Sequence, residues 1–172
     1  VNNRPNDVSL LVNGTQVGAT SANVTVAIAE PAITAITKTI LPVSASYLPG
    51  DSVTYTLAFG NVSAGNTNAA TAFGIVLTDT FNTNLTLGAV NITSTQGVSG
   101  VATCAGGNSF TAGSSTAGQL VTVNISCLDP GNTVNVTVNA AIGAGTTSGT
   151  TISNTAGLTY TSLPGAQGNC AA

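Results

Sequence analysis

Alternation of apolar and polar residues over short stretches constrains the fold of this chain more than any other feature. Residues 52–59 (SVTYTLAF) place an apolar side chain at every second position, and residues 121–125 (VTVNI) and 134–138 (VNVTV) do the same. Successive side chains of a β-strand point to opposite faces, so a period of two is typical of strands with one buried face. Helical periodicity is sustained nowhere in the sequence. We therefore expect β-sheets.

Turn signals separate these stretches. They are LPGD at 48–51, GNVSAGNTN at 60–68, DPGN at 129–132 and GAGTTSGT at 143–150. Short alternating strands with Gly, Pro, Asn and Asp between them are typical of an antiparallel β-sandwich. We expect one all-β domain over residues 31–165, with residues 166–172 as a C-terminal tail.

The charge content excludes several functions. Among 172 residues there are two basic and five acidic residues and no histidine. Such a chain cannot build the basic surface that nucleic acids or anionic membranes require. It also has no Ser/His/Asp set, no plausible metal cluster, no phosphate-binding loop and no paired carboxylates, so we expect neither an enzyme nor a cofactor. Low net charge favours association between copies.

The cysteines indicate an oxidising compartment. Three cysteines occur without histidine, which favours disulfide chemistry over a zinc site. Cys104 and Cys127 bracket about two dozen residues and could form a disulfide that stabilises the fold by roughly 3 kcal/mol; two buried thiols are the alternative. Cys170 is left without an assigned partner.

Other features agree with an extracellular location. No apolar run approaches the roughly 20 residues of a membrane span, so membrane insertion is not expected. Because the chain contains no methionine, we expect it to be a processed product or a segment of a longer one. Asn-X-Ser/Thr sequons offer glycan acceptors, although a chain this rich in Asn, Thr and Ser produces many by chance. They begin at Asn13, Asn23, Asn61, Asn84, Asn91, Asn124 and Asn135.

The only lysine of the chain lies in a strand-like stretch, ITAITKTIL, on the apolar side. By alternation Lys38 shares its face with Ile36 and Ile40. The same argument turns Asp79 inward in GIVLTDTF and Asn154 inward in TISNTAGLTY. Isolated charges are costly in a core, where a lysine tends to lose its proton and a carboxylate tends to gain one. Alternation therefore turns all three polar side chains toward the interior of the sandwich.

Residues 1–30 do not fit the sandwich as neatly. Asn13-Gly14 lies between strand-like flanks in DVSLLVNGTQV, which is a strong hairpin signal, and NVTVAIA is another strand-like stretch. This pattern indicates a β-hairpin arm. An ordinary pair of extra strands in the same sandwich is the alternative.

An ordered set of motifs resembles a known family. EPAITAITKT, LPGDSVTYTLAFGN, VLTDTF, LDPGNTVNVTVNA and ISNTAGLTYTSLPG follow one another over residues 30–165. This succession resembles the "domain of unknown function eleven" repeat of bacterial and archaeal surface proteins, which is similar to the isopeptide-forming domains of fimbrial subunits. The short ending GNCAA departs from the family, which usually continues through further strands.

The resemblance implies a fold and a function. It implies an immunoglobulin-like sandwich used as a module of an extracellular filament, surface stalk or adhesin. We expect a structural subunit or repeat module on the cell surface or in a filament. The alternative is an adhesin module whose loops at 60–71 and 104–118 bind a carbohydrate or a host surface.

The resemblance also implies a cross-link. In the fimbrial pattern a neutral lysine attacks an asparagine carboxamide beside an assisting acid, and ammonia leaves. Here the three groups would be Lys38, Asn154 and Asp79. A buried Lys38–Asp79 salt bridge with Asn154 hydrogen-bonded nearby is the alternative, and such a bridge often contributes little net stability.

The resemblance finally places residues 1–30 at the closing strands of a preceding module. Isolated hairpins are marginal and exposed strand edges recruit partners, so we expect this arm to pack on a neighbouring copy beside its Asn154-bearing strand. The resulting contact would build a head-to-tail homopolymer by strand complementation. Its apolar positions are Val8, Leu10, Val12, Val24, Val26 and Ile28.

Overall fold

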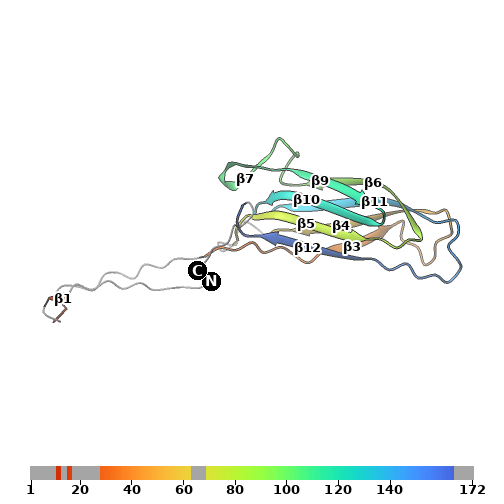
Figure 1. Cartoon of the computed structure of the whole chain (residues 1–172), viewed down its shortest axis with the longest axis horizontal. Coiled ribbons are helices and arrows are strands. Elements are labelled where there is room, and N and C mark those ends of the chain that lie inside the picture. Colours follow the sequence, from red (N-terminus) through yellow and green to blue (C-terminus); the bar gives the residue numbers. More distant parts are fainter. Residues whose placement is uncertain (1–10, 13–14, 17–27, 63–68, 165–172) are drawn as a thin grey trace.

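The computed structural model describes residues 11–12, 15–16, 28–62 and 69–164, and the regular secondary structure of this part of the chain is almost entirely β (Figure 1). Its one helical element is a single 3-10 turn, Ala105–Gly107. Among the described residues no helix is long and apolar enough to cross a membrane.

Two four-stranded antiparallel sheets form the body of the molecule, with strand orders β12-β5-β10-β9 and β3-β4-β11-β6. They pack as an immunoglobulin-like β-sandwich, which confirms the predicted fold class. The bounds of the first sheet are β12 (Thr155–Thr161), β5 (Ala72–Thr80), β10 (Leu120–Leu128) and β9 (Ala112–Ala117). Those of the second are β3 (Thr37–Leu41), β4 (Ser52–Gly60), β11 (Thr133–Ile142) and β6 (Leu85–Ser94).

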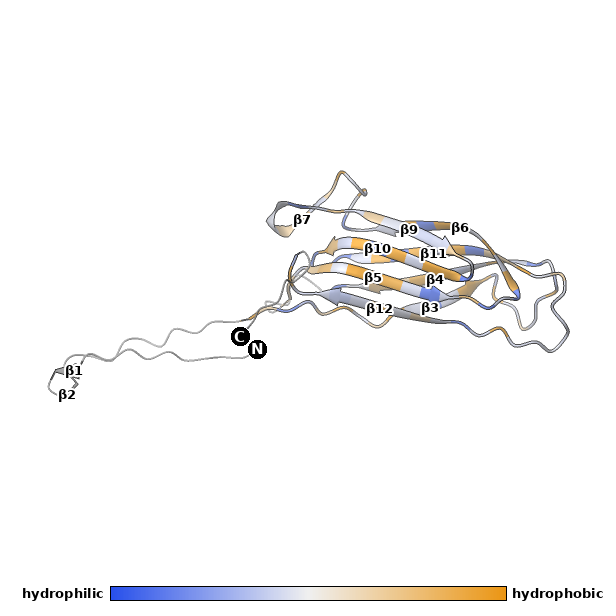
Figure 2. Cartoon of the chain, viewed as in Figure 1, coloured by the Kyte–Doolittle hydropathy of each residue, from blue (hydrophilic) through white to orange (hydrophobic). Residues whose placement is uncertain are grey.

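The core lies between the two sheets and follows the alternation of the sequence. Figure 2 shows apolar residues running along β5 and β10. The inward residues of β4, β10 and β11 are buried at every second position, while most of their neighbours face solvent and carry hydroxyl or amide groups. The largest fully buried apolar side chains are Phe110, Leu57, Ile75, Leu77, Ile125 and Leu128.

The strands β3 and β12 are the edge strands that matter for the site. Each is hydrogen-bonded on one side only, β3 to β4 and β12 to β5. The predicted strand 33–41 is shorter in the structure, because the ladder is interrupted between the Thr37–Ala58 pair and an isolated bridge from Ile33 to Asn61.

The predicted turns lie at the ends of strands. In 48–51 the Asp51 amide donates to the Leu48 carbonyl at 3.0 Å, and the Leu48 amide donates to the Asp51 carboxylate at 2.7 Å. Gly50 has φ +93°, a left-handed conformation that favours glycine. Residues 129–132 join β10 to β11, and residues 143–154 join β11 to β12.

The expectation that 104–118 forms a long loop is wrong. This segment contains the short hairpin β7 (Thr103–Cys104) and β8 (Asn108–Ser109), followed by the edge strand β9. A Cys104–Cys127 disulfide joins β7 to β10, as predicted. The Asp129 carboxylate also accepts hydrogen bonds from the Ala105 amide at 3.1 Å and from Gln96 Nε2 at 3.0 Å. These contacts explain why the segment is folded.

The hairpin predicted around residues 13–14 is present. The strands β1 (Leu11–Val12) and β2 (Thr15–Gln16) pair antiparallel as a sheet of their own and join neither four-stranded sheet. Ile28 is exposed. The other predicted arm positions, Val8, Leu10, Val24 and Val26, lie outside the described residues, as do residues 166–172.

Candidate functional site

The side chains of Lys38 and Asp79 meet across the sandwich. Lys38 Nζ lies 2.6 Å from Asp79 Oδ2, although Lys38 belongs to the edge of one sheet and Asp79 to an inner strand of the other. The Asp79 side chain is 2% exposed and that of Lys38 is 20% exposed. Both groups point inward, as alternation predicted, and the short contact forms a charge-assisted hydrogen bond.

Asn154, the residue directly before β12, contacts the same carboxylate oxygen. Ala156 pairs with Asp79 in the β12–β5 ladder, so Asn154 lies on the same face one pleat away. Its Nδ2 donates to Asp79 Oδ2 over 3.4 Å. The structure therefore brings together all three polar groups that the sequence turned inward.

Two oxygens of this cluster are buried and accept no hydrogen bond: Asp79 Oδ1 and Asn154 Oδ1. Each would be costly to leave unpaired. A half-turn of the Asn154 carboxamide about Cβ–Cγ would exchange its nitrogen and oxygen. The amide oxygen would then face the Asp79 carboxyl group at the place where the amide nitrogen lies now.

Aromatic rings surround the lysine amine. Nζ lies 4.8 Å from the ring centroid of Phe81 and 5.3 Å from that of Tyr55, and the two rings meet edge to face at 5.2 Å. Burial lowers the pKa of Lys38, while the hydrogen bond and the charge of Asp79 oppose the shift. Burial also raises the pKa of Tyr55, so its phenol stays protonated. Alternation places Tyr55 on the buried face of its strand, but it does not predict that either ring contacts the amine.

Other positions correct the sequence interpretation. By alternation Tyr160 shares the face of Asn154 in TISNTAGLTY, yet it is 40% exposed near the end of the edge strand β12. Asn61 is no exposed glycan acceptor: it is 4% exposed, its Nδ2 donates to two backbone carbonyls, and its Oδ1 accepts from the Ala32 amide. Sequons with exposed asparagines on regular strands begin at Asn91, Asn124 and Asn135.

A groove of about 750 Å³ lies beside the cluster, at the end of the sandwich that holds the β3–β4 and β11–β12 loops. We call it the end groove. Residues 45–49 and 146–152 form its walls, and it is further lined by Ile40, Val53, Tyr55, Leu85 and Ile142. Its residues Ile40 and Ile152 are each two residues from a member of the polar cluster.

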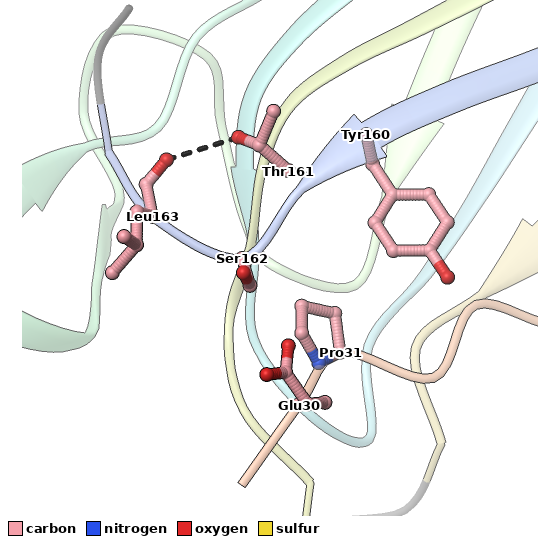
Figure 3. A pocket seen from close by; sticks show the side chains of 6 residues that line it. All are labelled: Glu30, Pro31, Tyr160, Thr161, Ser162 and Leu163. Atoms are coloured by element: carbon pink, nitrogen blue, oxygen red, sulfur yellow. Dashed lines mark hydrogen bonds between the residues drawn. The ribbon is translucent and has the colours of Figure 1, made fainter. Parts of the chain in front are cut away.

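A second, smaller hollow of about 410 Å³ lies near the other end of β12. Figure 3 shows its lining by Glu30 and Pro31 on one side and residues 160–163 on the other. The Thr161 hydroxyl donates to the Leu163 carbonyl at 2.9 Å across this segment. The hollow thus marks the place where residues 28–31 meet the end of the last strand.

Among the described residues no group of three or more His, Cys, Asp or Glu side chains could hold a metal ion. Asp79 and Lys38 form the only salt bridge found in that part of the chain. The chemistry that the cluster can perform is therefore that of an amine, a carboxyl group and a carboxamide in contact.

Comparison with known proteins shows a fold rather than a family. No protein-family model matches the sequence, and no curated protein matches it. The fold is similar to the N-terminal domain of the Streptococcus gordonii adhesin Sgo0707, with a TM-score of 0.52 and 21% identity over 74% of this chain and 29% of that chain. It is also similar to the pilus backbone RrgB of Streptococcus pneumoniae, with a TM-score of 0.52 and 19% identity over 80% of this chain and 55% of that one.

A third solved structure, the RrgA Jo.In complex, matches 93% of this chain and 90% of its own with a TM-score of 0.53 and 15% identity. The chain thus spans slightly less than a third of the matched adhesin chain and just over half of the matched pilus backbone. At these identities the likeness concerns the β-sandwich itself.

Proposed function

We propose that this chain is a structural module of an extracellular filament or cell-surface stalk, and that a Lys38–Asn154 isopeptide bond stabilises it. The proposal rests on the convergence of Lys38 and Asn154 on one oxygen of Asp79. Its sandwich is shared with domains of a pilus backbone and of an adhesin, and the motif order resembles surface-protein repeats.

The reaction begins with a proton transfer inside the 2.6 Å contact. The Lys38 ammonium gives a proton to Asp79, which leaves a neutral amine beside a carboxylic acid and keeps the net charge of the pair unchanged. Burial of both groups favours the neutral pair over two separated charges. The amine then has a free electron pair for attack.

Lys38 Nζ attacks Cγ of Asn154, and the acid of Asp79 polarises the amide oxygen. As the tetrahedral carbon collapses, the bond from Cγ to Nδ2 breaks and the bond from Cγ to Nζ remains. The proton lost by Nζ ends on the leaving nitrogen through the Asp79 carboxyl group. One ammonia leaves, a secondary amide is formed, and no oxidant or cofactor is needed.

Such a bond would join the two sheets at their open edge. Lys38 lies on β3 and Asn154 precedes β12, which are edge strands of different sheets. Pulling on the chain would otherwise peel these edge strands first, since each has a hydrogen-bonded neighbour on one side only. A covalent tie at this place suits a protein under tension.

For assembly, we infer that residues 1–30 of one copy complete the sandwich of the next by strand addition. The free edge of β12 offers the unpaired backbone groups that strand addition requires. Because the donor and acceptor surfaces differ, the contact need not close and can continue as a fibre.

The adhesin alternative now has less support from the loops. One of its two loops, 104–118, is occupied by β7, β8 and β9 and is tied down by the disulfide. The other, 60–71, is described only at its ends. A structural role is therefore the function we favour.

Intact-mass spectrometry of the wild type, Asp79→Ala and Asn154→Ala tests the cross-link. We expect only the wild type to be lighter than its sequence by one ammonia beyond the loss of disulfide hydrogens. Deletion of residues 1–29 tests the assembly separately: the truncated chain should fold and stay monomeric, as judged by sedimentation and electron microscopy. Fibres formed by the truncated chain would rule out strand addition by the arm.

A further inference from the structure

The end groove lies at one end of the sandwich, and the chain enters the sandwich near residue 30 at the other end. Figure 1 places residues 143–154, drawn in blue, at one end of the sandwich, and the ribbon near residue 30 at the other. The groove walls come from the loop that precedes β12 and from the loop between β3 and β4. A copy that inserts its N-terminal segment into the groove of the next copy would extend the chain of molecules in one direction.

The chemistry of the groove is uncharged and mixed. None of its lining residues carries a formal charge, its deeper part is apolar, and hydroxyl groups of serine, threonine and tyrosine line its walls. Leu48 at its rim is 70% exposed, and the nearby Leu41 and Val43 are also exposed. Exposed apolar residues around a hollow are typical of a surface that another protein covers.

One lining group has an unused hydrogen-bonding capacity. Thr146 Oγ1 is buried and has no hydrogen-bond partner. Buried polar groups without a partner are rare in folded proteins. The uncharged, partly apolar lining of the end groove suits an inserted segment that combines apolar side chains with hydroxyl and amide groups.

We propose that the end groove receives residues 8–28 of a second copy. This inference rests on the head-to-tail assembly proposed above and names its acceptor site. Residues 8–28 carry no formal charge and alternate apolar residues with threonine, serine and asparagine. Such a segment has no charged group that would have to be dehydrated on entering an uncharged groove. Its apolar side chains can pack against the apolar residues that line the groove.

The end groove lies close in sequence to Lys38 and Asn154, so an inserted segment could continue from the groove along the free edge of β12. Ile40 and Ile152 line the groove, and along the chain they lie two residues from Lys38 and Asn154. A strand that leaves the groove along the free edge of β12 would pass over the Lys38 side chain, which is 20% exposed. Assembly would then shield the amine from water and seal the open edge of the sandwich.

An arginine placed on the groove wall tests the acceptor. Thr150 is exposed and lines the groove, so Thr150→Arg should fold normally and yet introduce a charge that the inserted segment cannot pair. We expect the full chain with Thr150→Arg to need about tenfold more protein for half-maximal assembly, measured by light scattering. Asn124→Arg, at an exposed position on β10, is the matched control and should assemble like the wild type.

A photo-reactive residue at Ser148 in the full chain gives an independent readout. Cross-links from Ser148 to residues 7–29 of another copy support the proposal, and cross-links confined to other segments overturn it. If deletion of residues 1–29 abolishes assembly while Thr150→Arg assembles at the wild-type concentration, the acceptor lies elsewhere and the proposed function stands. If the deletion leaves assembly intact, the strand-addition part of the proposed function itself fails.

A neutral oligosaccharide is the competing occupant. Oligosaccharide binding that Thr150→Arg removes, without any change in assembly, would assign the groove to a soluble ligand and overturn the proposal. No effect of an oligosaccharide on wild-type assembly, together with the Ser148 cross-links, supports the second copy as the occupant.

Discussion

Lys38 Nζ and Asp79 Oδ2 lie 2.6 Å apart although their strands belong to different sheets. Asn154, which directly precedes the edge strand β12, contacts the same oxygen. An amine, a carboxyl group and a carboxamide are thus in contact in a partly dry site walled by Phe81 and Tyr55. The groups that could form a covalent bond thus lie where that bond would tie one sheet of the sandwich to the other.

Asn154→Ala should lower the free energy of unfolding by about 5 kcal/mol. The proposed bond would close a loop of about 115 residues, and a cross-link of that length restricts the unfolded chain by roughly this amount in the loop-entropy treatment. Urea unfolding followed by circular dichroism measures the difference. Asn124→Ala, at an exposed strand position, is the control and should change stability by less than about 0.5 kcal/mol.

A loss of about 1 kcal/mol or less in Asn154→Ala would correspond to a single hydrogen bond. That outcome would favour the alternative in which Lys38 and Asp79 form only a buried salt bridge.

The pH dependence of Asn154→Ala should report the Lys38 amine. Burial lowers the pKa of Lys38 in the folded chain below the 10.5 of an ordinary lysine. In the pH interval between the lowered pKa of the folded chain and 10.5, the unfolded chain therefore binds more protons than the folded one. Stability from this group therefore rises with pH across the interval and is constant below it. Tyr55 opposes the trend above pH 10.0, because burial raises the pKa of its phenol.

The comparison of Asn154→Ala with Lys38→Met/Asn154→Ala separates the two groups, since both variants keep Tyr55. As pH rises from neutral toward 10, the unfolding midpoint of Asn154→Ala should increase relative to the unfolding midpoint of Lys38→Met/Asn154→Ala. Parallel pH profiles would show that Lys38 titrates as an exposed lysine, against the burial seen in the structure.

Removal of the disulfide should destabilise the sandwich by about 3 kcal/mol through release of a loop of roughly two dozen residues. The change is Cys104→Ser/Cys127→Ser, and thermal unfolding is the measurement. Because Asp129 also holds the segment, we expect the β7–β8 hairpin to exchange its amide hydrogens faster while β10 and β11 stay protected. Uniform loss of protection would contradict this local role.

Much of the fold could be predicted because alternation reports which face of a strand is buried. Val53, Tyr55 and Leu57 are buried at every second position, and Lys38 and Asp79 point inward as expected. Alternation does not say which strand lies opposite, however, so the contact of Lys38 with an inner strand of the other sheet had to come from three-dimensional packing.

Other misses have local causes. Tyr160 falls on the inward face by alternation but is exposed near the end of the edge strand β12, opposite a bulge of β5 in which Gly74 has φ +53°. The segment 104–118 is rich in Gly, Ser and Ala and looks like a loop, but the disulfide and the Asp129 contacts hold it as short strands. Asn61 looks like a sequon, yet its carboxamide is used to satisfy buried backbone groups.

The most direct measurement is tandem mass spectrometry of the proteolysed protein. We expect a branched peptide in which the chain around Lys38 is joined to the chain around Asn154, lighter by one ammonia than its two parts. The branched peptide should be absent from Asp79→Ala, whose Lys38 and Asn154 are otherwise intact. Recovery of unmodified linear peptides with both residues from the wild type would contradict the cross-link and leave a salt bridge in its place.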